Sequence, residues 1–338
     1  MQSGMGVSER VRVLGAAAAL VLFSALSACG GGGGGGNDNP PLEVSVSVDG
    51  VADASNPLTP GESTTIDVPS GANLVFGSQG ETRWKPTATS SSFDVNSFTF
   101  TSKSLTVSSN AGGTLVIVFS NKTDESQQAT LTIHVAPKEF QAVARVDGEI
   151  EGWSSSSVEA DGSASQYEFL RRTVLLDAGG YGTENSSTPG VYSWQRLLYD
   201  AQDRYLGYVN TQDGTECLYD NPLVYVNYPL QVGKTWSGDA TRNCNGSPLT
   251  YIQHYTRSVP AYERVTVPQG SHDALRIEGE AHTTVTSNDP IYSGYSYTWK
   301  STCWWAVDLG RNVKCEHAYE FDDGTTRTVS EVMTSLTR

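Results

Sequence analysis

Between residues 42 and 135, apolar and polar residues alternate in short segments. Between residues 42 and 48, Leu42, Val44, Val46 and Val48 alternate with Glu and Ser, which predicts a strand buried on one face. Comparable segments follow at residues 64–68, 73–76, 97–100, 104–107, 114–119 and 130–135, separated by Gly, Pro, Asn and Ser. Short strands with turn residues between them predict a β-sandwich over residues 42–136.

From about residue 139 the apolar segments become longer and richer in aromatic residues. Segments at 192–199 and 204–209 predict a hairpin, and Asp213-Gly214 and Asp323-Gly324 are two-residue hairpin signals. Further strands are expected at residues 259–267, 274–286, 292–301, 303–307, 312–321 and 325–335. Such a meander predicts an antiparallel curved sheet or incomplete barrel over residues 139–338, in an all-β protein. The β-sandwich expected at residues 42–136 resembles the immunoglobulin-like modules of bacterial surface proteins, which implies an immunoglobulin-like topology.

The N-terminus carries an export signal. An apolar run at residues 13–23 follows Arg10 and Arg12 and is shorter than the roughly 20 residues that span a bilayer. It ends in Leu26-Ser27-Ala28-Cys29, which resembles the lipobox of bacterial lipoproteins. The resemblance implies a signal peptide over residues 1–28 and a Cys29 that carries diacylglycerol and an acyl chain such as palmitate. An ordinary secretory signal with a chance cysteine is the alternative.

The residues after Cys29 are typical of a tether. Gly30 to Gly36 form an unbroken glycine run, followed by Asn, Asp and Pro, and such a segment cannot bury enough apolar surface to fold. Residues 29–41 are therefore expected to hold the folded part away from the lipid. In enterobacterial lipoproteins, Asp directly after the modified cysteine retains the protein at the inner membrane, and residue 30 here is Gly. The resemblance therefore implies lipid anchoring at the outer membrane, facing the periplasm or the cell surface.

The charge of the chain limits its partners. Lys and Arg number 22 and Asp and Glu 37, which gives a formal net charge of −15. A strongly acidic surface disfavours nucleic acid as a partner, so the expected membrane contact is the lipid anchor.

Four cysteines besides Cys29 predict two disulfides in an exported chain. Strands on either side of residues 308–310 place Cys303 opposite Cys315, unless a bulge at Gly310 shifts the register. Cys217 then pairs with Cys244. A four-cysteine zinc site is the alternative, although the sequence has no close C-x-x-C pair.

A set of turns and aromatic residues between positions 228 and 315 resembles uncharacterised bacterial envelope proteins. The motifs are P-L-x-V-G-x-x-W ending at Trp236, V-x-V-P-x-G ending at Gly270, A-x-x-I ending at Ile277, and W-W with a later G and V-K ending at Lys314. The resemblance implies a sheet similar to the half-barrel of envelope lipoprotein carriers. It supplies no catalytic residues.

No catalytic, metal or cofactor signature stands out in the sequence. Ser271, His272 and Asp273 are consecutive, and neighbours in a strand point to opposite faces, so they cannot form a triad with one another. Weak calcium binding by the acidic loop at residues 200–203 is an alternative. We expect no enzyme activity; a hydrolase with an unrecognised site is the competing class.

Tryptophans are the candidate ligand contacts. Trp236, Trp299, Trp304 and Trp305 lie in the second half of the chain, and the alternative is that they fill the core. The leading hypothesis is a non-enzymatic, lipid-anchored envelope lipoprotein whose C-terminal domain binds a hydrophobic or protein ligand. A surface glycan-binding lipoprotein is the second hypothesis.

The lipid anchor has a direct test. Radiolabelled palmitate is expected to enter the wild-type chain and not the Cys29→Ser variant, because that variant lacks the acceptor thiol. Equal labelling of both proteins would contradict the anchor.

Overall fold

A computed structural model describes residues 44–48, 51–52, 58–78, 84–90, 98–100, 104–107, 109–121, 124–177, 179–289 and 294–338. These residues form strands, turns and loops and contain no α-helix, which confirms the all-β prediction. Accordingly, no helix within them is long and apolar enough to cross a membrane. The expected signal peptide, Cys29 and tether lie outside the described residues.

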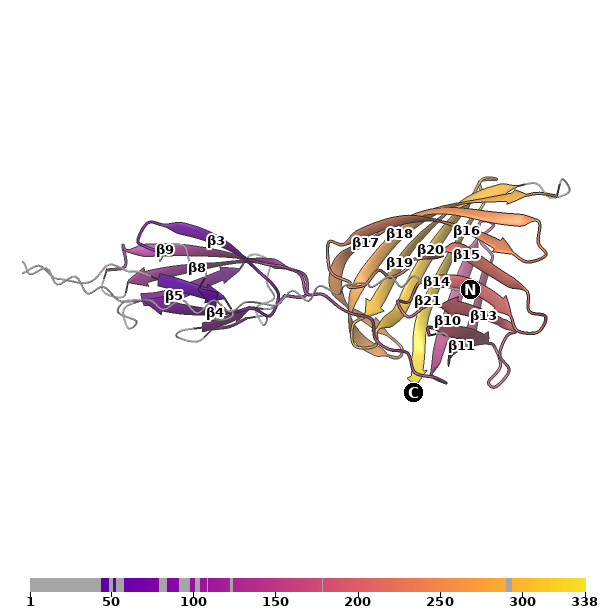
Figure 1. The fold of residues 1–338 in the computed structure, drawn as a ribbon, viewed down its shortest axis with the longest axis horizontal. Coiled ribbons are helices and arrows are strands. Elements are labelled where there is room, and N and C mark those ends of the chain that lie inside the picture. The colour runs from indigo at the N-terminus through magenta and orange to yellow at the C-terminus, as the bar shows by residue number, and fades with distance from the viewer. Residues whose placement is uncertain are drawn as a thin grey trace, which may run out of the picture. The chain divides into compact units, whose positions relative to one another are not determined.

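The N-terminal strands form two sheets. The five-stranded sheet has the order β2-β1-β4-β7-β6, and the four-stranded sheet has the order β3-β9-β8-β5. Their bounds are β1 Val44–Val48, β2 Val51–Ala52, β3 Ser63–Val68, β4 Asn73–Ser78, β5 Trp84–Ser90, β6 Phe98–Phe100, β7 Ser104–Val107, β8 Gly113–Asn121 and β9 Gln128–Val135. Figure 1 labels most of them.

The two sheets share one apolar core. In β8, Leu115, Ile117 and Phe119 are fully buried, and Phe76 of the other sheet lies with its ring centroid 5.3 Å from that of Phe119. Alternation therefore turns every second side chain of each sheet into a common interior, as a β-sandwich requires. The immunoglobulin-like topology stays a prediction; β3 pairs with β9 in parallel.

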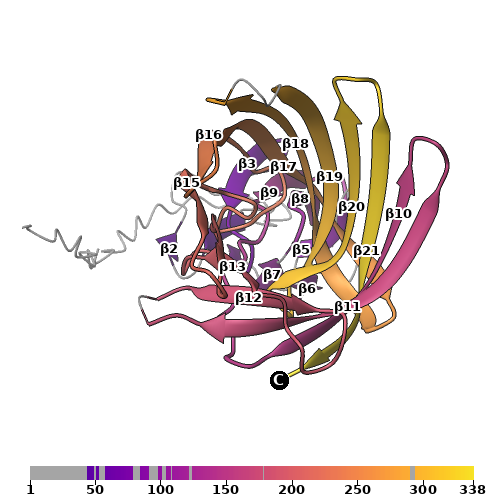
Figure 2. The ribbon, with the colours of Figure 1, turned by 90° about the vertical axis from the view of Figure 1, so that its right-hand side faces the viewer.

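Twelve antiparallel strands form the C-terminal part, and the ring they make is closed. They are β10 Ile150–Glu159, β11 Ala164–Leu175, β12 Tyr181–Ser186, β13 Gln195–Tyr199, β14 Tyr205–Asn210, β15 Glu216–Leu223, β16 Thr235–Cys244, β17 Leu249–Val267, β18 Gly270–Ser287, β19 Tyr295–Ala306, β20 Arg311–Phe321 and β21 Thr326–Thr337. Each pairs with the next, and β10 pairs with β21 (Figure 2).

The prediction of a curved sheet or incomplete barrel was therefore wrong about closure. Closure rests on β10, whose pairing with β21 runs from Ile150 opposite Thr337 to Glu159 opposite Arg327. The sequence of β10 includes Ser154 to Ser157 and has no apolar alternation. Every strand backbone offers hydrogen bonds whatever its side chains are. The backbone hydrogen bonds of β10 therefore complete the ring.

The long strands present two different faces. In β17, Gln253, Tyr255 and Arg257 are buried, whereas the intervening His254 and Thr256 are exposed. The face that carries the buried residues of β17 is aromatic and packs into two adjoining clusters, which include Leu275, Ile277 and Trp305 in one and Tyr205, Tyr255 and Ala281 in the other. We call this the aromatic face and its reverse the hydroxyl face.

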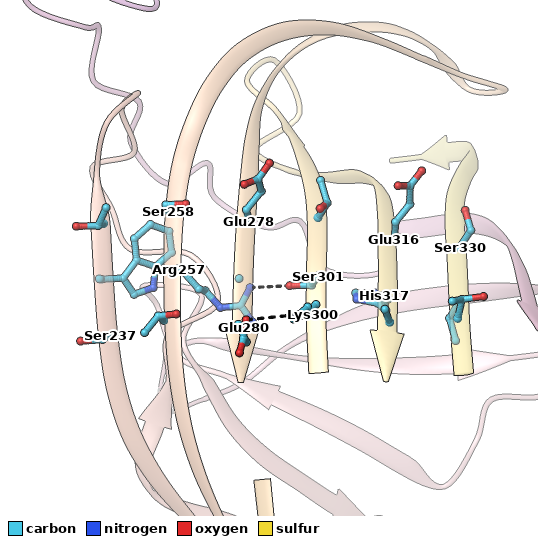
Figure 3. A pocket seen from close by; sticks show the side chains of 18 of the residues that line it. Ser237, Arg257, Ser258, Glu278, Glu280, Lys300, Ser301, Glu316, His317 and Ser330 are labelled. Carbon is cyan, nitrogen blue, oxygen red and sulfur yellow. Dashed lines mark hydrogen bonds and ion pairs between the residues drawn. The ribbon is translucent and has the colours of Figure 1, made fainter. Parts of the chain in front are cut away.

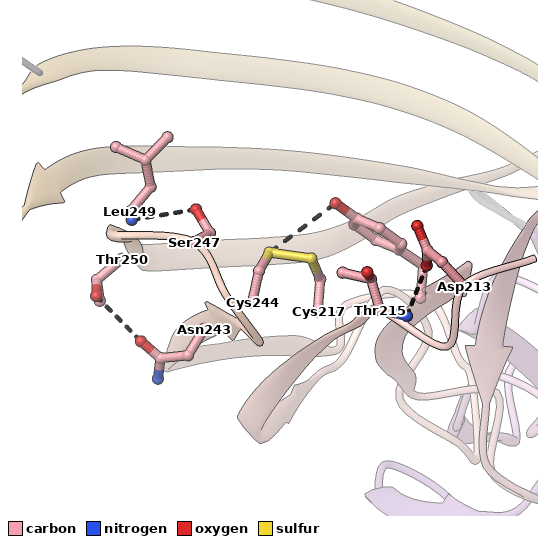
Figure 4. The surroundings of a disulfide bond; sticks show 9 residues. Asp213, Thr215, Cys217, Asn243, Cys244, Ser247, Leu249 and Thr250 are labelled. Atoms are coloured by element: carbon pink, nitrogen blue, oxygen red, sulfur yellow. Dashed lines mark hydrogen bonds between the residues drawn. A yellow bond between two sulfur atoms is a disulfide. The ribbon is translucent and has the colours of Figure 1, made fainter.

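Both disulfides join residues that lie opposite each other in neighbouring strands, and they are the two pairs that the sequence favours. Cys217 faces Cys244 across β15 and β16, with a Cα separation of 3.9 Å (Figure 4). Cys303 faces Cys315 across β19 and β20, with a Cα separation of 4.1 Å. The extra residue in this register is Val313 rather than Gly310, because Trp304 pairs with Lys314 and Trp305 with Asn312.

Removing the Cys217–Cys244 bridge tests how much the ring depends on its short β15–β16 ladder. The Cys217→Ala, Cys244→Ala double variant should lose about 3 kcal/mol of unfolding free energy, because the unfolded chain gains loop entropy. Urea unfolding with and without a reductant measures the loss. A midpoint equal to that of the oxidised wild-type protein would contradict it.

Candidate functional site

One cavity of about 1200 Å³ extends across seven neighbouring strands, β16 to β21 and β10. Its walls consist of three successive cross-strand rows (Figure 3). The middle row runs from Trp236 through Arg257, Gly279, Ser301 and His317 to Val329. The first flanking row runs Thr235, Ser258, Glu278, Thr302, Glu316, Ser330, Ser156, and the second runs Ser237, Thr256, Glu280, Lys300, Ala318, Thr328, Val158.

The cavity lies on the hydroxyl face. Neighbouring rows of a sheet point to opposite sides, so the cavity can meet the side chains of only one set. Side chains two residues away from the middle row point to the same face as that row. Tyr255, Trp299 and Tyr319 are such residues, and none of them lines the main cavity. The flanking rows therefore supply the side chains, while the middle row supplies backbone and packs its own side chains behind.

Hydroxyl-bearing residues are the most frequent on this surface. Of the fourteen flanking-row residues, eight are Ser or Thr, namely Ser156, Thr235, Ser237, Thr256, Ser258, Thr302, Thr328 and Ser330. A hydroxyl both donates and accepts a hydrogen bond. Such a surface suits a ligand that itself carries many donors and acceptors.

The carboxylates at the cavity are each matched by a cation. Glu278 lies 3.1 Å from Arg276, Glu316 lies 2.7 Å from Lys314, and Glu280 lies 3.9 Å from Lys300. These groups are half-exposed, so each pair contributes little to stability. Their effect is to leave the wall close to neutral, which removes a strong preference for a charged ligand.

A smaller cavity of about 320 Å³ continues the same surface. It shares Ser237, Thr256 and Glu280 with the large cavity and adds Asp239, His254 and His282, among others. Asp239 and His254 lie opposite each other and form an ion pair that depends on protonation of the histidine. The two cavities together make one elongated surface lined by hydroxyl-bearing and charged residues.

Behind the cavity, the middle row holds two buried basic groups. The Arg257 guanidinium lies over the rings of Tyr225 and Trp299 at 4.8 and 5.1 Å and donates to the Ser301 hydroxyl at 3.3 Å. Burial lowers the pKa of Arg257. Burial, followed by the neighbouring Arg257 charge, lowers the pKa of His317 to about 4, so its ring is neutral at pH 7 and its Nδ1 accepts a hydrogen bond from Trp299.

The structure separates the four tryptophans expected to contact ligand. Trp305 is 1% exposed in the core, and Trp299 packs against Tyr225, His317 and Tyr319 on the aromatic face. Trp236 lines the cavity from the middle row and donates to the Val224 carbonyl. Trp304 alone of the four shares the face of Thr302. It lies outside the residues that line the cavity and packs, half-buried, against the apolar cluster that includes Val265 and Met333, with Lys314 over its ring at 4.4 Å.

Two other sequence candidates are accounted for by local contacts. His272 bonds Asp308 and Gln269, whereas Ser271 bonds Thr266 and Asp273 pairs with Arg264, so the consecutive Ser, His and Asp point to different partners. Cys303, Cys315 and His317 bring possible metal-ligand atoms within 4.8 Å of one another. Both sulfurs are in a disulfide, and metal binding requires thiolates.

The sequence patterns did not predict that the two flanking rows form a site. Their residues are scattered over seven strands, and only the register brings them together. One signal was present: Thr235 and Ser237, and Thr256 and Ser258, repeat a hydroxyl with the period of two that a strand face requires.

Comparisons with known proteins find distant structural likenesses only among solved structures. No protein-family model and no curated protein matches it. The solved structures with a distant likeness include a provisionally named lipoprotein from Parabacteroides distasonis, a provisionally named exported protein with a YmcC-like fold from Bacteroides fragilis, and the hypothetical lipoprotein YmcC from Escherichia coli.

These likenesses are weak. Sequence identities are 10%, 13% and 11%, with TM-scores of 0.32, 0.32 and 0.30. The matches cover 59%, 59% and 53% of this chain and 100%, 100% and 83% of the other chains. Scores at this level assign neither fold nor function, so the site is interpreted from its own residues.

The depressed pKa of His317 predicts a pH-dependent stability. The unfolded histidine titrates near its ordinary value of 6.5, and the folded one at about 4. Between these values the unfolded state binds more protons, so stability is full above pH 6.5 and falls as the pH drops toward 4. Between pH 7 and pH 5, the wild-type protein should lose about 2 kcal/mol more unfolding free energy than His317→Gln.

Urea unfolding of both proteins at the two pH values measures this difference. The Gln variant keeps a hydrogen-bond acceptor for Trp299 and lacks the titrating ring. Parallel losses in the two proteins would show that His317 does not titrate as its surroundings require.

Proposed function

We propose that this protein is a lipid-anchored lipoprotein of the bacterial outer membrane whose barrel domain binds a neutral glycan without chemical conversion. The observation that carries the ligand class is the hydroxyl face, where Ser and Thr predominate and each carboxylate has a cation beside it. Sugars present closely spaced hydroxyls that exchange hydrogen bonds with such groups. The lipobox and glycine tether support the anchored, extracytoplasmic location, facing the periplasm or the cell surface.

The size and shape of the cavity favour an extended ligand. Cavities for small molecules usually enclose about 300–1,000 Å³, and the main cavity alone measures about 1200 Å³. The adjoining space at Asp239, His254 and His282 lengthens it. Several sugar units in a row fit this surface better than one compact molecule.

Trp304 gives the surface one aromatic edge. It lies on the hydroxyl face, and its indole Nε1 donates to Glu263 at 2.6 Å, which fixes the ring. Lys314 covers one side of the ring. Partly exposed aromatic rings that are already oriented bind sugar rings at little entropic cost.

A hydrophobic or protein ligand stays a prediction. The aromatic residues that suggested an apolar ligand pack against one another, as the Tyr205, Tyr225 and Trp299 rings show. The surface of these rings is buried in the core and is not exposed to a ligand.

The absence of catalysis is part of the proposal. His317, the histidine among the residues that line the main cavity, belongs to the middle row and bonds Trp299 behind the sheet. A hydroxyl becomes a strong nucleophile when an adjacent base takes its proton. The flanking rows offer Glu278, Glu280 and Glu316, which face cations instead.

A glycan array probed with the purified full-length protein tests the function. Binding should be lost in Ser258→Tyr and Thr302→Tyr, because each new ring enters the cavity from a flanking row. Thr266→Tyr is the matched control, since Thr266 is exposed and lies outside the cavity.

The outcomes are distinct. Neutral glycans retained by wild-type protein and Thr266→Tyr, and lost by the two cavity variants, support the proposal. Failure of the wild-type protein to bind any neutral glycan, or equal binding by all four proteins, would overturn it.

A further inference from the structure

A second, smaller cavity lies among charged side chains on the aromatic side of the barrel. Its volume is about 140 Å³, and its lining includes Arg145, Arg171 and Arg311 together with Glu151 and Asp203. It shares no lining residue with the hydroxyl-face cavity. Its size admits a molecule of a few non-hydrogen atoms, well below the usual range for larger ligands.

The two acidic groups of this cavity already have close partners. Arg311 lies 2.6 Å from one Glu151 oxygen, and the Trp153 indole donates to the other at 2.9 Å. The Tyr228 hydroxyl donates to Asp203 at 2.7 Å. These carboxylates are therefore satisfied by groups other than Arg145.

Arg145 is the group left without a close acceptor. Its side chain is only 13% exposed, and the carboxylate oxygens of Glu151 and Asp203 lie 3.9 and 3.7 Å away, beyond hydrogen-bond distance. Its Nε is buried with no hydrogen-bond partner. A guanidinium offers five N–H donors, and leaving them unfilled in a buried place is costly.

Three further polar atoms of the lining are buried without partners. They are the Thr183 hydroxyl, in a residue 7% exposed, the Trp305 indole Nε1 and the Asn312 side-chain oxygen. Thr183 comes from β12, Trp305 from β19, Asn312 from β20 and Arg145 from the segment before β10. Unsatisfied groups from separate parts of the chain thus converge on one small space.

Arg145 is the charge of this space that lacks a close counter-charge. The lining groups and their direct ion-pair partners comprise Arg145, Arg171 and Arg311 against Glu149, Glu151 and Asp203, three charges of each sign. Glu149 and Glu151 lie 2.7 and 2.6 Å from Arg311, whereas no carboxylate lies that close to Arg145. A buried charge without a close partner is stabilised most directly by a counter-ion placed beside it.

We propose that this cavity binds a small carboxylate anion, with its oxygens accepting hydrogen bonds from Arg145 and its remaining polar contacts made by Thr183. A carboxylate accepts two N–H bonds from a guanidinium at once. It brings a negative charge to Arg145, which lacks a close carboxylate, and only a few atoms, in keeping with the volume.

Such an anion would fasten the segment that leads into the barrel. Phe140 exchanges two backbone hydrogen bonds of 2.8 Å with Leu230, and Val143 packs against Gly310 so closely that a Cβ there would lie 2.2 Å from the valine. Arg145 continues this segment into the cavity. Occupancy of the cavity therefore links the entry segment, β10 and the Asp203 turn.

Thermal unfolding of the full-length protein tests the proposal. Acetate or formate is titrated against a bulky sulfonate at constant ionic strength, because the sulfonate is too large for the cavity. The melting temperature of the wild-type protein should rise and then saturate, as binding to the folded state requires. Arg145→Gln should lose the rise, and Arg264→Gln, which changes a largely exposed arginine, should keep it.

Thr183→Val keeps the test decisive if Arg145→Gln fails to fold. In sulfonate alone this variant should melt at the wild-type temperature or above, because it removes an unsatisfied hydroxyl and keeps its shape. In acetate it should gain less than the wild-type protein. Coincident wild-type curves in acetate, formate and sulfonate would show that the cavity holds water only and would overturn the proposal, as would a full rise in both cavity variants.

Discussion

The constraint on which this structure depends is the two-residue alternation of side chains along a strand. In β17 it sends Tyr255, Arg257 and Val259 to one side and His254 and Thr256 to the other. Because twelve strands pair in one closed ring, the alternation is carried across the sheet row by row. The aromatic face can therefore pack into the core, while the hydroxyl face presents its polar groups to solvent and ligand.

Local patterns predicted many of the strands, but not β10, β11, β12, β15 or β16, and not the closure of the ring. The hairpin at residues 192–209, the turn at 308–310 and the cysteine pairs depend on neighbours in sequence, and their strands pair as expected. Closure depends on β10 meeting β21, which are separated by most of the barrel sequence. Ser154 to Ser157 give β10 no apolar period, and backbone hydrogen bonds leave no trace in composition.

The candidate site was harder to predict because large aromatic side chains were expected to contact the ligand, whereas they fill the core. Trp299 and Trp305 are large and aromatic, and those properties are what a barrel uses to fill its core. The residues that line the cavity are small: Ser258, Thr302 and Ser330 occupy one row because β17, β19 and β21 share a register. No single segment carries that information. A period-two repeat of hydroxyls in neighbouring strands is the feature that could have indicated it.

The two cavities show how the same alternation handles charge. On the hydroxyl face, Glu316 and Lys314 are two residues apart on one strand, so they share a face and neutralise each other near solvent. On the aromatic side, Arg311 and Glu151 are far apart in sequence and meet only after the ring closes. Buried charges of that kind demand close partners. Arg145 lies in the segment that precedes β10, and the nearest carboxylates, Glu151 and Asp203, are beyond hydrogen-bond distance. An anion bound from solution would supply the close partner that this buried guanidinium lacks.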